Sequence, residues 1–169
     1  MLRMFMFVLA FVTFGIANAE AKDIKVGIIL GFTGPIESLT PDMAAGAELA
    51  FAEASDSGAL LGGSTISVSR ADSTCIDSAA ATTAAEGLVS EGVTAIVGAD
   101  CSGVTGAVLA NVAVPKGVPM ISPSATSPAL TTAEDNGLFF RTAPSDARGG
   151  EVLADITADR GVSLSLIHI

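Results

Sequence analysis

Residues 98–106, which read GADCSGVTG, place a carboxylate, a thiol and a hydroxyl where the pattern predicts the start of a helix. Asp100, Cys101 and Ser102 closely follow the apolar run VTAIV (93–97). A helix N-terminus suits a bound carboxylate, because its first N–H groups have no intrahelical partner and the helix dipole is positive there. The alternative role for Ser102 is that of a plain N-cap residue.

Two other segments have the same character. GFTGPIES (31–38) and SPSATSP (122–128) each follow an apolar run and are rich in small and hydroxyl-bearing residues. In open α/β sheets, ligands bind outside the carboxyl ends of the strands, where such loops meet. The three loops together therefore predict one binding surface.

Groups that would make this surface catalytic are missing from the sequence. The single histidine, His168, stands at the end of the chain, so no Ser/His or Cys/His pair can form in its body. The chain has no G-x-S-x-G elbow, phosphate loop, dinucleotide fingerprint or metal-ligand spacing. We therefore expect a binding protein with no catalytic residue, metal or cofactor.

The first residues have the layout of a secretory signal. Arg3 precedes the apolar run Met4–Ile16, and Ala17-Asn18-Ala19 is a small-x-small cleavage site, which predicts a signal peptide over 1–19. The alternative is a membrane anchor, but the apolar run is shorter than the roughly 20 residues that span a bilayer. We expect an exported, periplasmic chain.

Charge and cysteine content narrow the possible partners. The formal net charge is −10 and there is neither Trp nor Tyr, which disfavours nucleic acids and anionic membranes as partners. Cys75 and Cys101 are the only cysteines, and an even number in an exported chain favours a disulfide. Two buried free thiols are the alternative.

Apolar runs and helical patterns alternate along the chain. Strands are predicted over 23–31, 64–72, 93–99, 118–122 and 138–144, and helices over 40–56, 77–90, 102–116 and 146–160. Thr40 is the expected N-cap of the first helix and Asp77 that of the second. This order is typical of an α/β fold with a doubly wound parallel sheet.

Several of these segments resemble a known family. KVGIILGFTGPI (25–36), the stretch from Ser69 to Gly103 with both cysteines, and GVPMISPSATSPALT (117–131) are similar to the periplasmic leucine/isoleucine/valine-binding proteins. These are the solute receptors of branched-chain amino acid ABC transporters. The resemblance implies lobe one of a periplasmic-binding-protein type I fold, truncated before most of lobe two.

The resemblance also implies roles for single residues. A disulfide would join Cys75 to Cys101 and pin the binding loop. The hydroxyl and N–H of Ser102 and the hydroxyl of Thr126 would hold the α-carboxylate of an amino acid, and the backbone carbonyl of Ser124 would accept from its ammonium group.

Two positions depart from the family pattern. Asp100 stands where the branched-chain receptors have an apolar residue, and Leu39 stands where they tend to have an aromatic residue beside the ligand side chain. Both departures place leucine, isoleucine and valine in doubt as ligands and indicate a solute with a polar side chain, an amide or another small carboxylate-bearing solute.

The resemblance divides the chain into a signal peptide (1–19), a ligand-binding lobe (20–145), the first helix of a second lobe (146–163) and a tail (164–169). Without a second lobe to pack on, the apolar face of that helix (Val152, Leu153, Ile156) should be exposed. The tail LSLIHI has two interpretations, the first strand of lobe two or a translated sequencing adapter, and we expect the adapter.

The expected function is that of a periplasmic receptor, a monomer that binds an amino acid and delivers it to an ABC transporter permease. The main alternative is a periplasmic ligand sensor of the same fold with no transport role. An α/β enzyme is a third possibility, disfavoured by the missing nucleophile–base pair.

Overall fold

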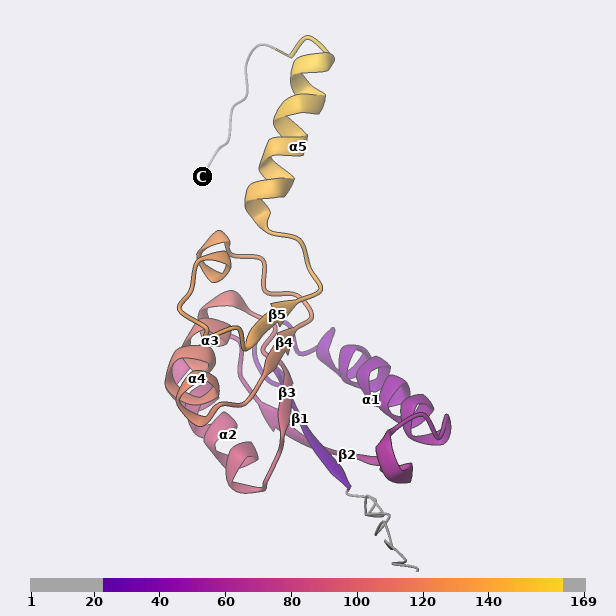
Figure 1. Ribbon diagram of the computed structural model, residues 1–169. Coiled ribbons are helices and arrows are strands. Elements are labelled where there is room, and N and C mark those ends of the chain that lie inside the picture. The colour runs from indigo at the N-terminus through magenta and orange to yellow at the C-terminus, as the bar shows by residue number, and fades with distance from the viewer. Residues whose placement is uncertain (1–22, 163–169) are drawn as a thin grey trace, which may run out of the picture.

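A computed structural model of the chain describes residues 23–162, so the predicted signal peptide and tail lie outside the described residues. Five parallel strands form one sheet in the order β2-β1-β3-β4-β5 (Figure 1). Their bounds are β1 Ile24–Leu30, β2 Ile66–Asp72, β3 Ala95–Gly98, β4 Met120–Ser122 and β5 Phe139–Arg141. The predicted α/β class with a doubly wound parallel sheet is confirmed.

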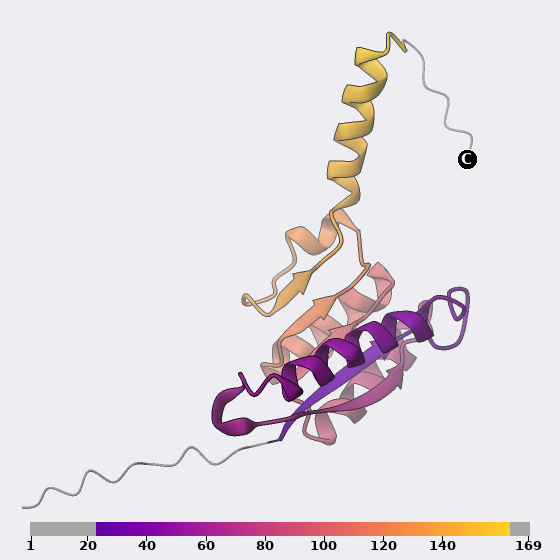
Figure 2. The same cartoon turned by 90° about the vertical axis from the view of Figure 1, so that its right-hand side faces the viewer.

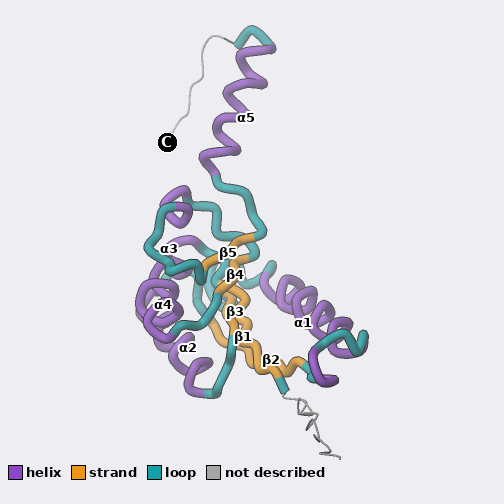
Figure 3. Tube along the Cα trace, in the orientation of Figure 1, coloured by secondary structure: helices purple, strands orange, loops and turns teal. Residues whose placement is uncertain are grey.

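The helices lie where the sequence predicts them, with one interruption (Figure 3). Their bounds are α1 Thr40–Asp56, α2 Ser78–Ser90, α3 Ser102–Val108, α4 Val114–Lys116 and α5 Asp146–Asp159, with short 3-10 turns at Leu61–Gly63 and Pro128–Thr131. The expected single helix 102–116 contains a π-helical turn, Leu109–Ala113. Pro115 has no N–H to donate to the carbonyl four residues earlier, which favours this local widening.

Helices α2 and α3–α4 cover one face of the sheet (Figure 1). Inward residues of the strands pack there against the helices in one apolar core. Its buried members are Ile29, Ala81, Ala85, Leu88, Val93, Ile96, Ala99, Val104, Val108, Leu109, Val112, Ala113, Val118 and Met120. Such continuous burial accounts for most of the stability of a domain of this size.

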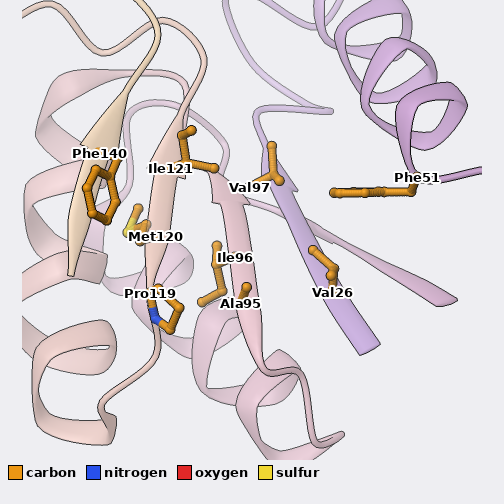
Figure 4. A pocket seen from close by; sticks show the side chains of 9 residues that line it. All are labelled: Val26, Phe51, Ala95, Ile96, Val97, Pro119, Met120, Ile121 and Phe140. Carbon is orange, nitrogen blue, oxygen red and sulfur yellow. The ribbon is translucent and has the colours of Figure 1, made fainter. Parts of the chain in front are cut away.

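The opposite face of the sheet is only half covered. Helix α1 packs on β1 and β2 through Ala44, which is buried, and through partly buried residues such as Met43 and Phe51. Side chains alternate between the two faces of a strand, so Val97, Ile121 and Phe140 face the side that α1 leaves uncovered. With their neighbours they line an apolar groove of about 300 Å³ (Figure 4).

Helix α5 leaves the lobe at the carboxyl edge of the sheet and extends away from it (Figure 2). Val152, Leu153 and Ile156 are 38%, 62% and 44% exposed, which confirms the expected exposure of its apolar face. Among the described residues, no helix is long and apolar enough to cross a bilayer.

Candidate functional site

The candidate site lies at the carboxyl edge of the sheet. All five strands are parallel, so the loops after β1, β3 and β4 end at this one edge. Helices α1, α2, α3 and α5 all begin there (Figure 1). The structure thus brings together the three loops that the sequence singles out.

The start of α3 offers unsatisfied donors. Cys101, not Ser102, occupies the N-cap position, and its side chain makes no capping hydrogen bond. The N-cap role considered for Ser102 is therefore wrong, because Ser102 is already the first helical residue. The first N–H groups of α3 have no partner within the helix, and the helix itself supplies no side-chain cap for them.

Ser102 itself links two of the loops. Its Oγ accepts a hydrogen bond from the N–H of Ser127, at an N···O distance of 3.1 Å. A serine hydroxyl that accepts in this way still has its own proton to donate. Ser102 is partly buried and therefore belongs to the surface of the lobe and not to its core.

The disulfide joins the loop after β2 to the start of α3. Cys75 and Cys101 are bonded at an S–S distance of 2.07 Å, with their Cα atoms 5.2 Å apart. The predicted pairing is confirmed, and the alternative of two free thiols is excluded. The bridge fixes the residue directly before Ser102.

The loop after β4 is attached to the loop after β3 through two serines. Ser122 is buried, and its hydroxyl donates to the carbonyl of Ala99 while accepting from the N–H of Ala125 at 3.0 Å. The hydroxyl of Ser124 donates to the backbone carbonyl of Asp100 at 3.0 Å. These bonds set the position of the Ser124 backbone, whose predicted ligand contact stays a prediction.

Arg141, in β5, holds the far side of the same loop. Its guanidinium donates to the carbonyls of Ser127, at 2.8 Å, and Ala125, at 3.3 Å. Sequence reasoning assigned no part to Arg141 or Ser122, because their partners are backbone carbonyls brought close only by the fold. Hydroxyls or charges at the ends of predicted strands are the signal that could have indicated them.

The hydroxyl of Thr126 contacts a carboxylate of the protein itself, and its predicted contact with a ligand carboxylate stays a prediction. Its Oγ1 donates to Asp146 Oδ2 at 2.9 Å, and the N–H of Asp146 donates back to the Thr126 carbonyl at 3.0 Å. Asp146 is the exposed first residue of α5. The sequence predicts Asp146 only as the start of a helix, although an acidic residue directly after a predicted strand-end loop is a signal for a site.

The start of α1 differs from the prediction in one respect. Leu39, not Thr40, occupies the N-cap position. Thr40 is the first helical residue, and its buried hydroxyl donates to the carbonyl of Gly31 at 3.0 Å. Leu39 is 60% exposed at this edge, and its predicted contact with a ligand side chain stays a prediction.

Asp100 lies beneath the site and not on its surface. The residue is only 2% exposed, and its carboxylate accepts hydrogen bonds from Gly31, Ser73 and Cys101. This differs from the expectation of a ligand-facing carboxylate. The physical reason is that protein donors already occupy both carboxylate oxygens.

The acidic residue Asp72 shapes the rim between β1 and β2. Partial burial opposes its ionisation, but hydrogen bonds from the Thr33 hydroxyl and from nearby backbone N–H groups outweigh this effect, so the pKa of Asp72 is lowered.

Within residues 23–162, no group of three or more His, Cys, Asp or Glu side chains could hold a metal ion.

A family comparison gives this geometry a context. The sequence profile described as "Periplasmic binding protein" matches residues 23–167. The chain belongs to the periplasmic binding protein family. The predicted resemblance is therefore confirmed, and the relatives found are named as binding proteins and not as enzymes.

Individual relatives agree with this assignment. The chain is 32% identical over 145 residues to Leu/Ile/Val-binding protein homolog 3 of Brucella melitensis, covering 85% of this chain and 38% of that protein. It is 35% identical to LivJ of Streptococcus pneumoniae, whose crystal structure contains isoleucine, with a TM-score of 0.66 over 74% of this chain and 35% of that one.

A third relative carries a different ligand. A solute-binding protein of an ABC transporter from R. palustris, solved with benzoate, is 28% identical with a TM-score of 0.70, covering 83% of this chain and 38% of that one. The chain spans well under half the length of each of these relatives.

Proposed function

We propose that the protein containing this chain is a periplasmic receptor that binds a free amino acid between two lobes and delivers it to the permease of an ABC transporter. The observation that carries the proposal is the juxtaposition of donors and acceptors at the carboxyl edge. The uncapped start of α3, with Ser102, offers donors, and Asp146 offers a carboxylate beside Thr126. An amino acid has the complementary pair of charges.

The α-carboxylate of the ligand is assigned to Ser102. The first N–H groups of α3 and the Ser102 hydroxyl proton would donate to it, and the positive end of the helix dipole favours the negative charge. Hydrogen bonds to a charged group contribute about 1.5–3 kcal/mol each. The hydroxyl of Thr126 is the second donor, which requires it to turn from Asp146 to the ligand.

The ammonium group of the ligand is assigned to Ser124 and Asp146. The Ser124 carbonyl would accept one of its hydrogens, as the family resemblance implies. Asp146 adds a full negative charge at the rim, 2.9 Å from Thr126 Oγ1. When a ligand carboxylate takes the Thr126 hydroxyl, the Asp146 carboxylate is released to pair with the ammonium.

An aromatic acid is the second candidate ligand, because a relative of similar fold was solved with benzoate. Benzoate would satisfy the donors at Ser102 and Thr126 in the same way. It has no ammonium, however, and would leave the exposed carboxylate of Asp146 facing an anion. The charge of Asp146 therefore favours an amino acid.

Delivery to a permease and sensing without transport remain two uses of the same site. The relatives that are solved with ligands are named as transporter components, which supports transport. We further propose cleavage after Ala19, a monomeric receptor in the periplasm, and residues 20–145 and 146–163 as parts of two lobes. The permease and ATPase genes expected beside this gene distinguish transport from sensing.

Calorimetry on the complete protein tests the binding role. Titration with each of the 20 common amino acids and with benzoate should give a dissociation constant in the micromolar range or below for at least one amino acid. Asp146→Asn should weaken the amino acid and spare benzoate. Binding of benzoate alone would replace the amino acid with an aromatic acid, and binding of neither would overturn the proposal.

A further inference from the structure

The carboxylate of Asp100 connects the ends of three adjacent strands. Oδ2 accepts from the N–H of Gly31, directly after β1, at 2.6 Å. Oδ1 accepts from the hydroxyl of Ser73, directly after β2, at 3.1 Å, and from the N–H of Cys101, after β3, at 2.8 Å. The backbone carbonyl of Asp100 also accepts from the hydroxyl of Ser124, after β4, so this one residue contacts the ends of four of the five strands.

The side chain of Asp100 is held by these donors and not by a cation. The ion pairs among the described residues are Lys25–Glu91, Arg70–Glu48 and Arg148–Glu151, and none involves Asp100. A buried carboxylate without a cation depends on hydrogen-bond donors for its stability. Its three donors therefore have to stay in place.

The arrangement requires both terminal atoms of the side chain at position 100 to be hydrogen-bond acceptors. An asparagine has the same shape but presents an NH₂ group in place of one oxygen. That group would face either the N–H of Gly31 or the N–H of Cys101, donor against donor. Glycine also suits the close approach at position 31, because a Cβ there would lie 3.2 Å from Asp100 Oδ2 and 3.2 Å from Cys75 Cβ, so these neighbours would have to move by a few tenths of an ångström.

We propose that Asp100 is a positioning residue, which sets the start of α3 and the loop after β1 for ligand binding without contacting the ligand. It acts through the N–H of Cys101, which directly precedes Ser102, and through Gly31. The proposal rests on the proposed function, since Ser102 is assigned to the ligand carboxylate there. If Asp100 does not contact the ligand, its carboxylate is no argument for a polar ligand. Leucine, isoleucine and valine are then again candidate ligands.

A pair of isosteric ligands separates positioning from direct contact. L-valine and L-threonine have the same shape and differ in polarity. Calorimetry on the complete protein with Asp100→Asn and Asp100→Leu should show both affinities falling by the same factor, roughly tenfold or more. The ratio of the two affinities should stay as in the wild type. A ratio that changes tenfold would show that Asp100 contacts the ligand and would overturn the proposal.

An NMR measurement tests the same idea without a ligand. With ¹⁵N-cysteine labelling, Asp100→Asn should shift the amide proton of Cys101 to lower ppm as its charged acceptor is lost. Asp77→Asn is the matched control, because it makes the same charge change at a helix N-cap where asparagine serves equally well. It should leave the Cys101 amide and both affinities unchanged.

Ser73→Ala provides a milder variant, which keeps the proposal testable if Asp100→Asn does not fold. It removes one of the three donors, so it should weaken both ligands less than Asp100→Asn and move the Cys101 amide less. Added to Asp100→Asn, it should have little further effect, because Ser73 acts through the same carboxylate.

The outcomes distinguish the two proposals. If the wild type binds neither amino acid, the proposed function fails for these ligands, and the Cys101 amide still decides whether Asp100 sets the start of α3. If Asp100→Asn lowers only the melting temperature, with the Cys101 amide and the affinities of the folded protein unchanged, Asp100 is structural and the positioning proposal is overturned.

Discussion

Helices α2 and α3 lie side by side on the same face of the sheet and begin at the same edge, yet they begin differently (Figure 1). The carboxylate of Asp77 accepts from the N–H groups of Ala79 and Ala80, which completes the start of α2. At the start of α3 the N-cap residue is Cys101, whose sulfur is bonded to Cys75. The side-chain cap of α2 satisfies its first N–H groups and so favours stability. The start of α3 is held by the disulfide instead, which leaves its first N–H groups free to bind a ligand.

Removing the disulfide that holds the start of α3 should have the largest effect on the free energy of unfolding. The bridge joins residues 26 positions apart, and the chain-entropy model gives about 3.5 kcal/mol for such a loop. The Cys75→Ser/Cys101→Ser variant of the complete protein should lose about this much free energy of unfolding in urea titrations. The wild type under reducing conditions is the control, and an unchanged urea midpoint in both would contradict the prediction.

Changes at Ser102, in the open start of α3, and at Thr126, in the loop after β4, should affect binding more than stability. Ser102→Ala and Thr126→Ala should each reduce the affinity for the amino acid by about 1.5–3 kcal/mol, because each removes a donor to a charged group. Calorimetry measures the effect. Ser90→Ala, at the far end of α2, removes a hydroxyl that donates to Glu86 and should have no effect on affinity. Full affinity in both site variants would refute the assignment.

A change at the capped start of α2 should affect stability and leave ligand affinity unchanged. Asp77→Ala removes the acceptor for two N–H groups and should cost about 1 kcal/mol of unfolding free energy. Ligand affinity at temperatures well below the transition should not change. A loss of affinity larger than the loss of stability would mean that α2 also belongs to the binding surface.

The smallest expected effect is on the pH dependence of stability. The pKa of Asp72 is lowered, because hydrogen bonds from Thr33 and Thr74 outweigh the effect of partial burial. A carboxyl with a lowered pKa contributes stability above its unfolded pKa of about 3.9. That contribution is lost as the pH falls through the folded value. Melting temperatures of wild type and Asp72→Asn should therefore converge on acidification below about pH 4, and parallel curves would contradict this.

The elements of the fold could be predicted from local patterns. Buried parallel strands appear as short apolar runs, and the cap at Asp77 is a local signal that the structure confirms. The sequence pattern predicts the caps of α1 and α3 one residue late, since the structure has them at Leu39 and Cys101. The Thr40 hydroxyl bonds to the carbonyl of Gly31, a contact across the loop that no local pattern contains.

The candidate site could be predicted only in part. Its three loops follow from the strand order, and the Cys75–Cys101 pairing followed from the resemblance. The burial of Asp100 could not be predicted, because its donors Gly31 and Ser73 are 69 and 27 residues away in sequence. Asp146 was missed for a related reason, since its contact with Thr126 exists only where α5 leaves the sheet.

The half-covered face of the sheet has a practical consequence for handling the isolated chain. Phe140 is 57% exposed and Ile121 39% exposed, and they line the apolar groove of Figure 4. Contiguous apolar surface of this kind binds hydrophobic dyes and promotes aggregation. The chain by itself should therefore enhance the fluorescence of 8-anilinonaphthalene-1-sulfonate. Charged substitutions such as Phe140→Lys should improve its colloidal solubility and make it a better sample for spectroscopy.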